Sequence, residues 1–295
     1  MILLVGATGM VGAEICRLLT ADGKPVKALA RATSDPTKMD RLKNMGATVV
    51  QGDLRDAASL KAACQGVNTV ITTASAMPFA YQPGENTPQT TDQAGYLGLI
   101  AAAKEAGVQQ FIYTSFPPMP IAFPLQDAKR AVEERLRGSG LTYTILQPTF
   151  FAEVWLSPAV GFDYPGRKAT IYGTGQNPIS WISYLDVAQF AVVSLDNPAA
   201  RNTTLKLGGP EDISPLNVVK IFEKVGGKPF EVTHVPVEAL QGQLAGATDP
   251  MQKSFAAMMI SYASAAAIDM TATLKAFPLK LRTVEEYVRS VMAQD

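Results

Sequence analysis

The chain opens with MILLVGATGMVG, a short apolar run that leads into three glycines at strict three-residue intervals. Ile2 to Val5 have the length and β-branched content of a buried strand. Gly6, directly after this run, permits a tight turn, Gly9 lets a phosphate approach the backbone, and Gly12 lets the following helix pack closely. The pattern therefore predicts a dinucleotide-binding loop, with a pyrophosphate on the free N–H groups that begin the helix.

The neighbours of these glycines belong to the same expected cofactor-binding loop. Thr8 adds a hydroxyl, and Met10 and Val11 form the first helical turn, whose N–H groups face the phosphates. Val11 then starts an apolar stripe that continues through Ile15 and Leu18, as in a helix that packs on a sheet.

Strand and helix patterns alternate through the first half of the chain. Strands are expected at 2–5, 25–30, 47–51, 67–73, 109–115 and 141–147, and helices at 10–21, 56–65, 91–106 and 126–138. Asp56 and either Thr91 or Asp92 are the expected N-caps of two of these helices. Regular alternation predicts an α/β fold, a doubly wound Rossmann sheet of parallel strands.

After residue 150 the alternation becomes less regular. Strands are expected near 169–172, 179–182, 203–207 and 230–235, and helices near 185–195, 214–225, 236–245, 250–263 and 283–293. We therefore divide the chain into a dinucleotide-binding domain at 1–150 and a substrate-binding region at 151–295. The later segments are expected to pack on the carboxyl edge of the sheet, where ligands bind.

The composition argues against several partners and sites. Lys plus Arg and Asp plus Glu are equal at 26 each, so no net charge attracts nucleic acid or an anionic membrane. Two cysteines without a CxxC pattern and a single histidine, His234, argue against a disulfide scaffold, a metal site or a Ser-His-Asp triad. The sequence shows neither a signal peptide nor an apolar run of membrane-spanning length, so we expect a cytoplasmic protein.

Several segments resemble the NmrA-like branch of the short-chain dehydrogenase/reductase superfamily, with its isoflavone-reductase-like and NAD(P)H:quinone-reductase-like members. The resemblance is carried by VGATGMVG, GDLRDAASL, LTYTILQPTFF and SYLDVAQFAV, and it covers most of the chain. It implies that Asp53 and Leu54 border an adenine, and that Thr73, Ala74 and Ser75 line the ribose of a nicotinamide.

The residue after the second expected strand bears on the choice of dinucleotide. An acidic residue there would favour NAD, but the strand ends in ALARATS, with Arg31 nineteen residues after Gly12. A guanidinium suits a 2′-phosphate, and Thr33, Ser34 and Lys38 lie close enough in sequence to help. NADP(H) is therefore favoured over NAD(H); the alternative is that Arg31 is an ordinary surface residue.

Lys129 is the first candidate for a catalytic role. Members of the superfamily commonly have a tyrosine four residues before this lysine, but the sequence reads LQDAK, with Leu125 in that place. At 100° per residue Lys129 falls inside the apolar arc of its helix, so it must snorkel or find a partner, and ribose hydroxyls would suit it. The charged residues off this arc are expected to lie mostly toward solvent: Arg130, Glu133, Glu134 and Arg137.

The carboxyl ends of the expected strands supply the remaining candidates. Ser115 ends the fifth strand and is placed to hydrogen-bond a substrate oxygen, although serines are common at strand ends. Pro148, Thr149 and Phe150 follow the sixth strand and should approach the nicotinamide. The loops 76–90 and 116–124 are the expected pocket walls, and an apolar substrate chamber is expected from Phe79, Phe116, Phe151 and Trp155, joined by Met258 and Tyr262.

Three functions remain open on the sequence. The first is an NADPH-dependent reductase of a small apolar or aromatic electrophile, such as a quinone or an enone, working as a monomer or homodimer. The second is a non-catalytic sensor that binds NADP(H) and reports its redox state to a protein partner, which the resemblance also allows. The third is an assembly factor for another protein, for which the sequence offers no distinct interaction patch.

Overall fold

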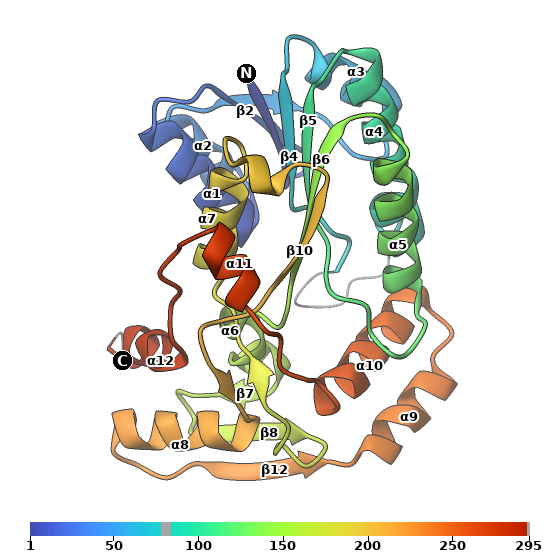
Figure 1. The fold of residues 1–295 in the computed structure, drawn as a ribbon. Helices are drawn as coiled ribbons and strands as arrows, with labels where there is room; N and C mark the ends of the chain where they lie inside the picture. The colour runs from blue at the N-terminus through green and yellow to red at the C-terminus, as the bar shows by residue number, and fades with distance from the viewer. Residues whose placement is uncertain (78–83, 294–295) are drawn as a thin grey trace.

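In the computed structural model, which describes residues 1–77 and 84–293, a seven-stranded parallel sheet forms the centre of the molecule (Figure 1). The chain crosses from β3 back past β1 to β4, so the direction of winding reverses between β1 and β4. Ligands of open parallel sheets bind outside the carboxyl ends of the strands at such a reversal. In order across the sheet, the strands are β10 (Thr203–Leu207), β6 (Thr142–Pro148), β5 (Gln110–Thr114), β4 (Thr69–Thr72), β1 (Ile2–Val5), β2 (Val26–Ala30) and β3 (Thr48–Gln51).

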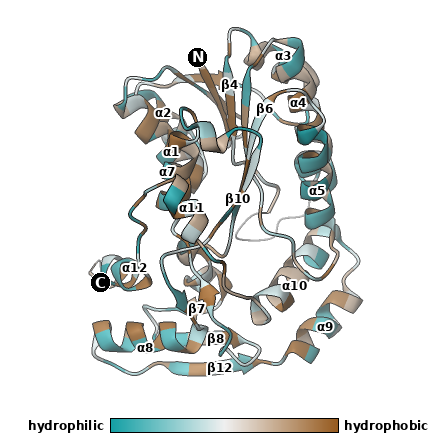
Figure 2. Cartoon of the chain, in the orientation of Figure 1, coloured by the Kyte–Doolittle hydropathy of each residue, from teal (hydrophilic) through white to brown (hydrophobic). Residues whose placement is uncertain are grey.

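Helices cover both faces of this sheet, which explains why β1 is buried along its whole length. Side chains alternate across a strand, so Leu4 packs in the core on one face and Leu3 in the core on the other. In Figure 2 the outer helix α5 is mostly hydrophilic, as a helix that faces solvent on one side should be. One face carries α1 (Met10–Ala21), α2 (Pro36–Asn44), α7 (Tyr184–Val193) and α11 (Thr271–Ala276); the other carries α3 (Ala57–Cys64), α4 (Tyr96–Glu105) and α5 (Pro124–Arg137).

The structure confirms the expected strands of the first half to within two residues, and with them the α/β fold. Within this half it adds one α-helix that we did not predict, α2, and after residue 150 it adds the short helices α6 (Ala152–Trp155) and α11. The signals for α2 are present in the sequence, because Asp35 caps the helix through the Thr37 N–H and Pro36 follows at the first helical position.

The helix expected at 91–106 begins earlier and differently. Thr87, and neither Thr91 nor Asp92, is its N-cap, and a reciprocal pair of hydrogen bonds with Thr90 completes the cap. The first turns, Pro88–Gly95, form a π-helix that leads into α4. The N-cap prediction was wrong because this wider helix places Asp92 inside the element, where its side chain is fully buried.

Residues after 150 contribute to the central sheet as well as to a smaller region beside it. β10 joins the sheet and α7 and α11 pack on one of its faces, while most other segments gather beyond the carboxyl ends of its strands (Figure 1). The division at residue 150 stays a prediction. The smaller region contains β7 (Phe162–Asp163), β8 (Lys168–Tyr172), β9 (Ile179–Ser180), β11 (Asp212–Ile213), β12 (Glu231–Val235), α6 (Ala152–Trp155), α8 (Pro215–Gly226), α9 (Val237–Gly246), α10 (Pro250–Ala263) and α12 (Val284–Met292).

A helix that crosses a membrane needs about 20 predominantly apolar residues in succession. Within the described ranges, no helix is both long enough and apolar enough to do so.

Candidate cofactor and substrate site

The glycine turn after β1 is built so tightly that two of its glycines cannot carry a side chain. Gly6 has a φ of +89°, in the left-handed region that favours glycine, and a Cβ there would lie 2.6 Å from the backbone nitrogen of Ala74. A Cβ on Gly12 would overlap the carbonyl oxygen of Gly6. The first glycine therefore makes the turn, and the third lets α1 pack directly against it.

Gly9 has a different role. It is exposed, its N–H donates to the Gly6 carbonyl at 3.0 Å, and it is the N-cap of α1 without a capping side chain. The first helical hydrogen bond runs from the Ala13 N–H to the Gly9 carbonyl, so the preceding N–H groups have no acceptor within the helix. With no acidic residue in the first turn of α1, this end of the helix fits a pyrophosphate.

Charged residues surround the expected adenosine end. Arg31 is exposed directly after β2, with its backbone N–H bonded to Ser34 Oγ at 3.0 Å. Arg55 holds both oxygens of the Asp53 carboxylate, at 3.0 and 2.8 Å. These hydrogen bonds, with a smaller contribution from the charge of Arg31, keep the pKa of Asp53 below its usual value. Arg31 therefore lies near a carboxylate that Arg55 already neutralises.

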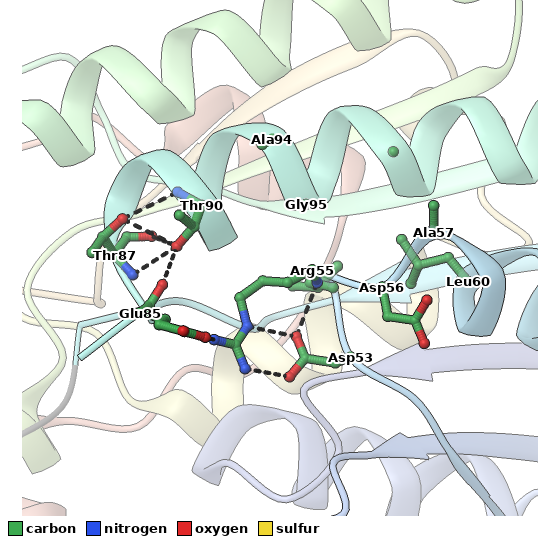
Figure 3. Close-up of a pocket in the computed structure, with 12 residues that line it drawn as sticks. Asp53, Arg55, Asp56, Ala57, Leu60, Glu85, Thr87, Thr90, Ala94 and Gly95 are labelled. Carbon is green, nitrogen blue, oxygen red and sulfur yellow. Dashed lines mark hydrogen bonds and ion pairs between the residues drawn. The ribbon is translucent and has the colours of Figure 1, made fainter.

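A groove of about 740 Å³ adjoins this end of the site (Figure 3). Leu54 and Leu60 line it, together with Gly95 at the end of the π-helix. Glu85 extends across one edge toward Arg55, 3.4 Å away. The groove thus borders the two residues expected beside the adenine, Asp53 and Leu54.

Lys129 is buried in an ion pair. Its Nζ lies 3.2 Å from Asp92 Oδ1 and 3.4 Å from the Thr114 carbonyl, and only about 5% of its side chain is exposed. The ammonium also lies 5.3 Å from the ring centre of Tyr96 and 5.1 Å from that of Tyr113, which places it between two aromatic faces. The lysine expected on the apolar face has therefore found a partner, and the partner is a carboxylate.

Asp92 and Tyr96 connect this ion pair to the loop after β4. The second carboxylate oxygen of Asp92 accepts a hydrogen bond from the Ala76 N–H at 2.8 Å. The Tyr96 hydroxyl donates to the Ala74 carbonyl at 2.6 Å and accepts from Thr72 Oγ1 at 2.7 Å. The segment expected to line the nicotinamide ribose, Thr73 to Ser75, is therefore fixed from the same side as Lys129.

A second charged cluster lies at the end of β5. Arg130 Nη2 donates to Ser115 Oγ at 3.0 Å and to the Phe116 carbonyl, and it lies 3.1 Å from Glu133 Oε1. Glu133 is only 2% exposed and also accepts from Gln147 Nε2 at 2.9 Å and Arg137 Nη2 at 3.2 Å. Burial lowers the pKa of Arg130.

The expectation that Arg130 and Glu133 lie toward solvent was therefore wrong. The helical spacing places both residues off the apolar arc of α5. That arc shows only which side chains pack on the sheet, and it does not show which other sides of the helix are covered. The loop after β5 and the side of β6 cover a second flank of α5, and polar residues fill the contact there.

The residues that follow β6 pack in two different regions of the structure. Thr149 is anchored by its N–H to the Leu207 carbonyl and by Oγ1 to the Ser180 carbonyl, directly after Pro148 ends the strand. Phe150 packs edge-on against Trp155 and Tyr262, with ring centres 4.9 and 5.5 Å apart. Phe151 instead packs with the core on the α1 face of the sheet.

The other apolar candidates adjoin one another through the α9–α10 pair. Phe116 packs in a cluster with Met258, and Trp155 packs in the next cluster along, while Ile121 and Leu244 contact both clusters. Trp155 also stacks on Tyr262 at 4.9 Å. Phe116, Trp155, Met258 and Tyr262 are thus in one apolar region, Phe151 is in another, and Phe79 lies outside the described residues.

Sequence reasoning did not assign two residues of this site, Asp92 and Arg130. For Asp92 the signal was indirect: an acidic residue four positions before Tyr96, on a helix otherwise rich in alanine and leucine. For Arg130 the helical pattern offered no signal, since the contact with Ser115 depends on the path of the loop after β5.

Known proteins similar to this chain identify its family. The model of the NmrA-like family matches residues 1–288. An NAD(P)H azoreductase of Xenophilus azovorans is 31% identical over 83% of the chain and 81% of its own length, and an isoflavone reductase homologue of Zea mays is 32% identical over 85% and 82%. An NADPH-dependent quinone oxidoreductase of Escherichia coli, solved with NADPH, has the same fold, with a TM-score of 0.77, 23% identity and 99% of each chain covered. The chain therefore belongs to the NmrA-like family.

Proposed function

We propose that this protein is an NADPH-dependent reductase of small apolar or aromatic electrophiles such as quinones and enones. The observation that carries the proposal is the glycine turn at the carboxyl end of β1, where Gly6 and Gly12 exclude side chains and the first turn of α1 is uncapped. Its place at the reversal of the sheet, together with the NAD(P)H-dependent relatives, supports a nicotinamide cofactor.

Different groups of residues hold the pyrophosphate, the adenine and the nicotinamide end of that cofactor. The turn at Gly6, Gly9 and Gly12, with Thr8, Met10 and Val11, holds the pyrophosphate; Asp53 and Leu54 border the adenine; and Thr73 to Ser75 with Pro148, Thr149 and Phe150 enclose the nicotinamide end. An ammonium has three N–H donors, so Lys129, which donates to the Thr114 carbonyl and forms an ion pair with Asp92, keeps a donor for a ribose hydroxyl. When bound, the nicotinamide supplies hydride.

The substrate end combines apolar surface with one hydroxyl. Phe116 and Trp155 offer flat apolar contacts, which suits an aromatic electrophile. Ser115 lies at the carboxyl end of β5 and donates to the oxygen of the substrate, which gains negative charge during reduction. Leu125 stands where a tyrosine that donates a proton is common in the superfamily. Quinones and enones fit this site because their reduction depends less on such a tyrosine.

The test is NADPH oxidation measured with a panel of quinones and enones. We expect turnover of at least one class, with a higher KM for NADPH after Lys129→Ala because a donor to the ribose is lost. Tight NADPH binding without turnover of any acceptor would contradict the reductase and favour the redox sensor. Absence of both binding and turnover in folded protein would contradict both functions.

Arg31 is proposed to select the phosphorylated cofactor. Arg31→Glu should weaken NADPH relative to NADH by about a hundredfold, or ~2.7 kcal/mol, since one charge-assisted contact becomes a repulsion. Titration calorimetry with both nucleotides measures this change. Arg41→Glu, the same charge reversal at another exposed position of the neighbouring α2, is the control and should leave the ratio nearly unchanged. A preference of the wild-type protein for NADH would contradict the assignment.

A further inference from the structure

We propose that Arg130 is a positioning residue for this reaction: its guanidinium holds the Ser115 hydroxyl as a hydrogen-bond donor aimed at the acceptor oxygen of the substrate. The inference rests on the proposed function, and it states which group donates and which accepts in the hydrogen bonds at the substrate end of the site.

The direction follows from the chemistry of the two groups. A guanidinium has N–H donors and no acceptor, so in the 3.0 Å contact between Arg130 Nη2 and Ser115 Oγ the serine oxygen accepts. The hydroxyl hydrogen of Ser115 is then free to be donated elsewhere. The Ser115 backbone is itself fixed, because its N–H donates to the Leu146 carbonyl at 2.7 Å.

Arg130 is held firmly enough to impose this direction. Nη2 also donates to the Phe116 carbonyl, the guanidinium lies 5.4 Å from the ring centre of Phe116, and Glu133 is 3.1 Å away. Glu133 is in turn held by Gln147 and Arg137. A series of contacts therefore runs from Gln147 on β6 to Ser115 at the end of β5: a hydrogen bond to Glu133, the ion pair of Glu133 with Arg130, and the hydrogen bond from Arg130 to Ser115.

During the reaction, negative charge develops on the substrate oxygen to which Ser115 donates. Addition of hydride to the β-carbon of an enone breaks the C=C π bond, and the electron pair moves through the conjugated system to leave negative charge on the oxygen. NADPH is the reductant, NADP⁺ is the oxidised product, and a proton from water completes the saturated ketone. A donated hydroxyl at the oxygen stabilises this charge, and the positive Arg130 behind it polarises the hydroxyl further.

The first test compares two hydride acceptors. A cyclic enone develops charge on oxygen, whereas a triarylmethane dye cation accepts hydride at carbon, becomes neutral and carries no oxygen. We expect Arg130→Met to lower kcat with the enone by ten- to a hundredfold, and Ser115→Ala by about a hundredfold, while turnover of the dye and the KM for NADPH change less than threefold. Arg130→Lys should restore part of the loss, because it returns a cation.

Two further variants separate positioning from a structural effect. The double variant Ser115→Ala with Arg130→Met should be no slower with the enone than Ser115→Ala alone, since Arg130 acts through the serine. Arg135→Met is the matched control: Arg135 is an exposed arginine of the same helix, on the side away from Ser115 and Glu133, so enone turnover should stay within twofold of wild type.

A binding measurement is independent of turnover. The protein loaded with NADP⁺ is titrated with 4-nitrophenol, and absorbance reports the pKa of the bound phenol. The wild-type site should lower this pKa because it stabilises the oxyanion, and Arg130→Met should remove most of the shift.

Equal losses with enone and dye, or an unshifted phenol pKa in the wild-type complex, would overturn the inference while leaving the reductase intact. Failure of the wild-type protein to bind NADPH or reduce any acceptor would instead contradict the proposed function.

Discussion

Replacing Asp92 with asparagine is expected to lower the free energy of unfolding by about 3–5 kcal/mol, as for other buried ion pairs that lose one partner. The substitution keeps the shape of the side chain and an oxygen for the Ala76 N–H, but it leaves the Lys129 ammonium with no counter-charge at 3.2 Å. Both side chains are at most 5% exposed, so water cannot replace the lost carboxylate. Chemical denaturation of the wild-type protein and the Asp92→Asn variant measures the difference.

A double-mutant cycle shows whether the pair itself causes the loss. Lys129→Met alone leaves a buried carboxylate and should be similarly destabilising, whereas Asp92→Asn with Lys129→Met removes both charges and should cost at least ~2 kcal/mol less than the sum of the single changes. The surface pair of Lys61 and Glu105, 2.9 Å apart and more than half exposed, is the control, and neutralising it should change stability by less than about 1 kcal/mol. Additive effects at Asp92 and Lys129 would contradict an energetically coupled pair.

Much of the central fold could be predicted because local patterns and tertiary structure agree there. The apolar run Ile2–Val5, buried on both faces, and the glycine turn after it are dictated by short stretches of sequence. The same is true of Asp56, which caps α3 as expected. β10 also has the composition of a strand, but its place beside β6 depends on a return of the chain that no local pattern indicates.

The polar part of the site could not be predicted to the same extent, because it depends on contacts between distant segments. Lys129 could be singled out, since a cation on an apolar arc requires a partner. Its partner could not be predicted, because Asp92 lies in a π-helix that begins at Pro88. The extra residue per turn of that helix changes which side chains face α5. Arg130 was placed toward solvent for a similar reason: the helical pattern accounts for packing on the sheet alone, without the loop after β5 that covers the other flank of α5.

Gly9 offers the sharpest test of the glycine turn, because it is the one glycine of the three whose substitution the fold tolerates. Its φ of −85° is open to any residue, and a Cβ there would meet only the Gly6 carbonyl oxygen at 3.4 Å. Gly12 cannot serve, because a Cβ at that position overlaps backbone and any loss of binding would follow from a displaced helix. Gly9→Val should therefore cost only about 1 kcal/mol of stability, mainly from a poorer N-cap.

The same substitution should weaken NADPH binding by at least a hundredfold, since the new side chain stands before the uncapped N–H groups that receive the pyrophosphate. Calorimetry gives the dissociation constant, and thermal unfolding shows whether the variant is folded. Gly242→Val is the control, a valine at an exposed glycine of α9 with open space around its Cβ, and it should bind NADPH as the wild type does. If Gly9→Val is folded and keeps wild-type affinity, the phosphates do not lie on this turn. The tight geometry at Gly6 and Gly12 would then reflect only the packing of α1 on β1, because nothing else about those two glycines requires a ligand.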